Sequence, residues 1–119
     1  LALSLALAGC AGTVRREESP WLKPSPNLRQ QIEEQAERLP WTHGLERVEL
    51  IRWFASVGEP AYPTLLELAS DERPEVAGAA LAALGATKDS RLVAHLHALP
   101  WPEDDPDLAL ERARTLLRL

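Results

Sequence analysis

The sequence predicts an all-α fold made of short helices, and three observations carry this prediction. Leu and Ala dominate the apolar residues, whereas Phe and Tyr occur once each, so few side chains favour strands. Almost no stretch alternates polar with apolar residues, as a half-buried strand would. Ten prolines and six glycines fall between apolar segments of helical periodicity, and they divide the chain into short helices.

Six helices are expected, each bounded by a capping residue, a proline or a glycine. Their ranges are residues 27–39, 45–57, 61–70, 74–84, 90–99 and 106–117. Gly58 is expected to end the second helix, and Gly85 the fourth. Taken in pairs, the six helices make three hairpins that account for the folded part of the chain, residues 28–119.

Internal similarity indicates that these hairpins are repeats. The stretch from Asp71 to Ala77 recurs 32 residues later as the stretch from Glu103 to Ala109. The tripeptide Leu39-Pro-Trp41 recurs as Leu99-Pro-Trp101. Repeats of this length predict a helical solenoid, in which each unit packs against its neighbours along one axis.

Residues 61–85 resemble a HEAT repeat unit. They contain an apolar first helix, the turn Asp71-Glu-Arg-Pro74-Glu-Val76, and an Ala/Leu second helix followed by Gly85. The resemblance implies a short right-handed α-solenoid of about three antiparallel helical hairpins, of the superhelix type shared by HEAT and ARM proteins. It also implies an interaction scaffold, with a lyase-like or ligand-handling accessory protein as the alternative.

The chain departs from the family pattern after the turn. Ala77, and Ala109 in the third unit, stand where the family usually has an arginine. We therefore expect the repeats to stack by apolar packing, without the polar ladder that this arginine provides.

The N-terminal residues carry a second resemblance. Residues 1–9 are apolar and uncharged, typical of the hydrophobic region of a signal peptide and too short to span a bilayer, which takes about 20 residues. They end in Leu7-Ala8-Gly9-Cys10, which resembles the lipobox of bacterial lipoproteins. In that family the cysteine thiol receives diacylglycerol, so the resemblance implies a lipid anchor at Cys10. The alternative is that Cys10 is an inert apolar residue.

This interpretation gives three regions. Residues 1–9 would be the signal peptide, truncated at its start because no Met or basic segment precedes it. Residues 10–27 would be the lipidated cysteine and a flexible Pro-rich tether, and residues 28–119 the repeat domain. The expected location is the bacterial cell envelope, lipid-anchored, with the outer membrane or periplasmic face favoured. A truncated product without activity is a further alternative.

No set of residues predicts catalysis, a metal site or a cofactor, so the chain is not expected to be an enzyme. His95 and His97 are two positions apart on one helix and point in different directions, and His43 has no ligand partners at metal-binding spacing. The acidic run 103–107 lacks the glycine and distal Glu of a calcium loop. With a net charge of −5 and no basic stripe, the sequence also predicts no nucleic-acid partner.

Two surfaces are candidates for binding a protein partner. The second helices of a HEAT-like stack line its concave face, where Ala79 and Ala82 would form a floor of small residues. Arg47, Arg52 and Arg112 would stand in charged walls beside it. Trp41 and Trp101 would lie on one edge of the stack, where each ring either staples its hairpin turn or anchors a partner.

Overall fold

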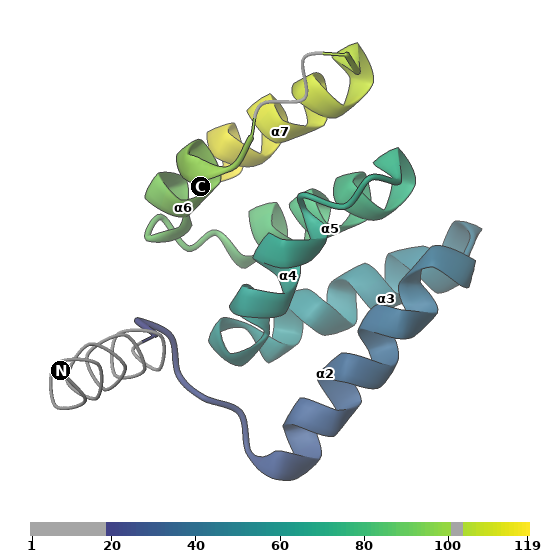
Figure 1. The fold of residues 1–119 in the computed structure, drawn as a ribbon, viewed down its shortest axis with the longest axis vertical. Coiled ribbons are helices and arrows are strands. Elements are labelled where there is room, and N and C mark those ends of the chain that lie inside the picture. Colours follow the sequence, from purple (N-terminus) through teal and green to yellow (C-terminus); the bar gives the residue numbers. More distant parts are fainter. Residues whose placement is uncertain (1–18, 101–103) are drawn as a thin grey trace, which may run out of the picture.

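The computed structural model describes residues 19–100 and 104–119, and every regular element within these ranges is helical. In chain order the elements are α2 (Pro26–Arg38), the 3-10 turn η1 (Leu39–Trp41), α3 (Gly44–Val57), the 3-10 turn η2 (Glu59–Ala61), α4 (Tyr62–Leu68), α5 (Pro74–Thr87), α6 (Leu92–Ala98) and α7 (Pro106–Arg118). The helices follow one another as three successive pairs (Figure 1). The prediction of an all-α, short helical solenoid is confirmed.

The helix boundaries follow from local chemistry. Ser25 and Asp105 cap α2 and α7, because their side-chain oxygens accept the backbone N–H of Leu28 at 3.2 Å and of Leu108 at 3.0 Å. Proline stands in the first turn of α2, α5 and α7, where its missing N–H costs no helical hydrogen bond. Gly58 follows α3 with φ +72° and ends it as predicted.

Gly85 does not end the fourth predicted helix. α5 continues to Thr87, and Lys88 ends it in the left-handed conformation with φ 56°. Gly85 is buried inside the helix, and a Cβ atom there would lie 3.4 Å from both Cα and Cγ2 of Thr115 in α7. The glycine therefore lies at a tight contact between α5 and α7 and does not serve a change of chain direction.

α5 is the central helix of the fold. It packs against α4, its partner in the second pair, and also against α3 and α7, between which it lies (Figure 1). Its buried residues are mostly small: Val76, Ala77, Ala79, Ala80, Leu81, Ala83, Leu84 and Gly85. Short side chains let neighbouring helix backbones approach closely, so α5 contacts helices of all three pairs.

Polar contacts also join the repeats, so the expectation that stacking rests on apolar packing alone is wrong. The hydroxyl of Thr115 in α7 donates to the carbonyl of Leu81 in α5 at 2.9 Å. The Tyr62 hydroxyl in α4 donates to Asp89, before α6, at 3.0 Å. These bonds use positions other than the one at which the family usually has an arginine.

The end of the predicted tether differs from expectation. Residues 19–25 form no helix, but Trp21 is only 7% exposed. Its ring packs edge-on against Tyr62 at 4.9 Å and tilted against His95 at 4.8 Å, while the Arg91 guanidinium lies 5.3 Å from its centroid. The aromatic and cation–π contacts dock this segment onto α4 and α6. The free energy gained by burying the large indole ring outweighs the conformational entropy that the short segment loses.

An ionic network surrounds the docked ring. Arg91 pairs with Asp89 at 2.7 Å and with Glu59 at 3.2 Å, and Glu59 also accepts the backbone N–H of Leu22 at 3.4 Å. The adjacent Arg91 lowers the pKa of Asp89 to about 2, since its guanidinium donates hydrogen bonds to the ionised carboxylate. The network links the N-terminal segment to the turns before α4 and α6.

Candidate functional site

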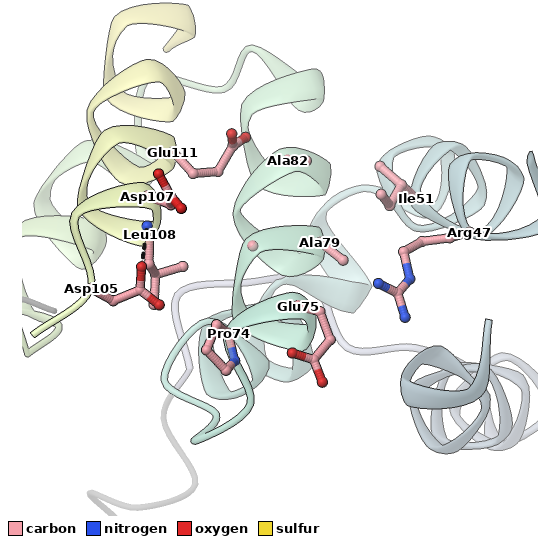
Figure 2. Close-up of a pocket in the computed structure, with 11 residues that line it drawn as sticks. Arg47, Ile51, Pro74, Glu75, Ala79, Ala82, Asp105, Asp107, Leu108 and Glu111 are labelled. Carbon is pink, nitrogen blue, oxygen red and sulfur yellow. Dashed lines mark hydrogen bonds between the residues drawn. The ribbon is translucent and has the colours of Figure 1, made fainter. Parts of the chain in front are cut away.

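A groove of about 550 Å³ opens between α3, α5 and α7 (Figure 2). Its residues come from all three helices and from the cap of α7: Arg47, Ile51, Pro74, Glu75, Gly78, Ala79, Ala82, Asp105, Asp107, Leu108 and Glu111. Figure 2 shows α5 in the middle, with α7 on one side and α3 on the other. The predicted floor residues Ala79 and Ala82 lie in this groove, as does Arg47.

The floor is one face of α5 that carries almost no side chain. Ala82 lies four positions after Gly78 and three after Ala79, which places it beside both residues on the helix surface. A Cβ atom built at Gly78 meets no atom within 4 Å. Packing inside the protein therefore does not require a glycine at position 78. Glycine lowers the stability of a helix by up to about 1 kcal/mol relative to alanine.

The α3 wall consists of Arg47 and Ile51. Arg47 is held from within the chain: its Nε donates to the Thr42 hydroxyl at 3.3 Å and its Nη2 to the Leu39 carbonyl at 3.4 Å. Arg52 is exposed and is not among the groove residues, because it lies about 100° around the helix from Ile51. Of the two arginines predicted on this wall, only Arg47 is therefore part of it.

The α7 wall is acidic. Asp105 precedes the helix as its cap, and Asp107, Leu108 and Glu111 follow along it. In Figure 2 these side chains lie on the side of the groove opposite Arg47. The α3 wall thus carries the one guanidinium of the groove lining, and the α7 wall carries three of its carboxylates.

Arg112 does not belong to this wall, contrary to the prediction. It is 4% exposed, and its guanidinium donates to the carbonyl oxygens of Leu96 and Pro100 at the end of α6. Burial lowers the pKa of Arg112. Position 112 is four residues after Leu108 and three before the buried Thr115, so helical periodicity could have placed it on the inner face of α7.

Trp41 lies on another edge of the molecule, in η1, and its ring is 79% exposed. The ring does not staple the turn; Leu39 and Thr42 do this instead, since both are 1% exposed and the Thr42 hydroxyl donates to the Leu39 carbonyl at 2.7 Å. Trp101 and Cys10 lie outside the described residues.

Among residues 19–100 and 104–119, no group of three His, Cys, Asp or Glu side chains is arranged to hold a metal ion. None of the helices in these ranges is long and apolar enough to cross a bilayer. His95, as described above, packs against the ring of Trp21.

A comparison with protein families supports the solenoid. A family model of HEAT repeats matches residues 41–117, a range that contains α3 to α6, all but the last residue of α7, and all the groove residues. The chain belongs to the HEAT repeat family. HEAT repeats generally serve as non-catalytic scaffolds, and no curated protein and no solved structure matches this chain.

The two glycines of α5 allow a matched stability test, because Gly78 lies on the open groove floor and Gly85 lies at the interface with α7. Gly78→Ala should raise the free energy of unfolding by about 0.5 to 1 kcal/mol, because the new methyl group meets nothing and the helix gains intrinsic stability. Gly85→Ala should give a smaller gain or a loss, because its Cβ would lie 3.3 to 3.4 Å from Arg118 and Thr115. Urea unfolding measures the free energy of unfolding of both variants. Equal gains would contradict the claim that position 78 is open and position 85 is tightly packed.

Proposed function

We propose that this HEAT-repeat chain is a lipid-anchored, non-enzymatic scaffold of the bacterial cell envelope, and that it holds a segment of a protein partner in the groove between α3, α5 and α7. The observation that carries the proposal is the floor at Gly78, Ala79 and Ala82, a helix face left without side chains beyond Cβ in a groove of about 550 Å³. A bare, concave face lets a partner backbone approach, as a segment bound in a groove requires.

The membrane attachment is supported by the lipobox-like Leu7-Ala8-Gly9-Cys10. Acyl chains on Cys10 would provide stable attachment, since each buried CH₂ contributes about 0.8 kcal/mol. The docking of Trp21 onto α4 and α6 shortens the free tether in this proposal. The chain from Cys10 to Trp21 spans at most about 40 Å when fully extended, so the scaffold would stay near the bilayer.

Trp41 would supply a second contact to the partner. Its ring is 79% exposed, and aromatic residues are enriched among the side chains that dominate binding energy. Trp101, at the repeat-related position in the sequence, is the corresponding candidate in the third unit.

The anchor is tested by Cys10→Ala. Without a thiol no thioether to diacylglycerol forms, so the protein should move from the membrane fraction to the soluble fraction of bacteria that export it. Fractionation and intact-mass analysis measure this directly, and the unmodified protein should carry the added mass of the lipid. Membrane retention of Cys10→Ala, or an unlipidated wild-type protein, would refute the anchor without affecting the groove.

The groove is tested by site-specific photo-crosslinking in intact cells. A crosslinking residue at position 82, on the groove floor, should capture a discrete protein, whereas one at position 33, exposed on α2, should not. Gly78→Leu should abolish the capture, because its side chain enters the groove, while Ala86→Leu on the exposed face of α5 should leave it intact. Capture that is equal from both positions, or unchanged in Gly78→Leu, would count against this site.

A further inference from the structure

The groove carries an uneven charge. Four carboxylates line it, those of Glu75, Asp105, Asp107 and Glu111, against one guanidinium, that of Arg47. One carboxylate oxygen of Asp105 already accepts a hydrogen bond from the Leu108 N–H at 3.0 Å. The other three carboxylates form none of the ion pairs found among the described residues, which are Arg38–Glu46, Arg73–Asp71, Arg91–Glu59 and Arg91–Asp89.

The nearby cations among the described residues offset this charge only in part. Arg47 is hydrogen-bonded to Thr42 and Leu39 of its own turn. Arg73, which precedes α5, pairs with Asp71 at 2.9 Å and is also attracted to Glu75 through space, and Arg112 is buried on the far face of α7 against the end of α6. Among the described residues, the carboxylates that line the groove therefore outnumber its one guanidinium, and the groove keeps a net negative charge.

Two of the carboxylates also repel each other. Asp107 and Glu111 are four residues apart on α7, and a like-charge pair at this spacing destabilises a helix by a few tenths of a kcal/mol. A cationic group placed between them would remove this repulsion and add an attraction.

The apolar parts of the groove define the rest of the ligand. Ile51 stands on the α3 wall, Leu108 on the α7 wall, and the floor between them consists of Gly78, Ala79 and Ala82. An occupant that contacts the floor and both walls needs one apolar face, and its cationic side chains then reach the carboxylates. This division of one segment into an apolar and a charged face is that of an amphipathic helix bound in a groove.

We propose that the partner segment is a basic amphipathic helix, with small apolar residues on the floor of the groove and Lys or Arg side chains against Glu75, Asp107 and Glu111. This inference rests on the proposed function and specifies the chemistry of its partner. Association with such a segment should be fast and sensitive to salt, because surface charges of opposite sign steer the encounter and are screened by ions.

The test uses the full chain carrying Cys10→Ala, so that no lipid competes, and two synthetic helical peptides with the same apolar face. One peptide has lysines on its polar face and the other has glutamates. The lysine peptide should bind at least about tenfold more tightly, a difference of about 1.4 kcal/mol, and should weaken as salt is raised. Amide chemical shifts should move at positions 78, 79 and 82 of the groove floor.

A matched pair of variants identifies the charges responsible. Asp107→Asn combined with Glu111→Gln should weaken binding of the lysine peptide by about fivefold, the effect of losing two partly exposed charge contacts. Glu33→Gln combined with Glu34→Gln, two exposed residues of α2 outside the groove, changes the net charge equally and should have no comparable effect. Equal weakening by both pairs would mean unspecific attraction and would overturn the inference.

The remaining outcomes separate the inference from the proposed function. If both peptides bind the groove equally well, or the glutamate peptide binds more tightly, the basic partner is wrong but the groove remains a binding site. If neither peptide shifts the floor residues, both the basic partner and the groove function are overturned.

Discussion

The fold depends on how closely α5 approaches the helices on either side of it. Four of its eight buried residues are alanine, and Gly85 faces Thr115 of α7. Among the described helices, α5 packs extensively against members of all three pairs. Larger side chains along it would push α3 and α7 outward, and the core residues that meet across these interfaces would lose contact.

The same use of small residues creates the candidate site. Buried alanines of α5 allow tight packing, and the outward-facing Gly78 and Ala82 leave a groove between the walls that α3 and α7 supply. The walls then differ in charge because Asp107 and Glu111 occupy the exposed side of α7, while Arg112 is turned inward to the carbonyl groups that end α6. One helix thus sets both the stack and its concave surface.

Periodicity and helix-breaking residues were enough to predict the all-α class and three helical pairs, because these features follow from local spacing. The groove floor was predicted from the resemblance to HEAT repeats, whose second helices line one face of the stack. Contacts between distant segments were not predictable in the same way. The docking of Trp21 against Tyr62 and His95 joins residues far apart in the sequence. Arg112 was assigned to the surface from its charge, although its spacing from Leu108 placed it inside, and the exposure of Trp41 depends on Leu39 filling the turn instead.

The unfolding free energies of two alanine-to-leucine variants on α5 test most directly whether close approach to this helix holds the stack together. Ala80 is fully buried and Ala86 is exposed on the same helix, so the substitutions change helix propensity equally. Ala80→Leu should lose about 1 to 3 kcal/mol by overpacking, whereas Ala86→Leu should stay within about 0.5 kcal/mol of the unmodified chain. Equal stability of the two variants would contradict the claim that close approach to α5 holds the stack together.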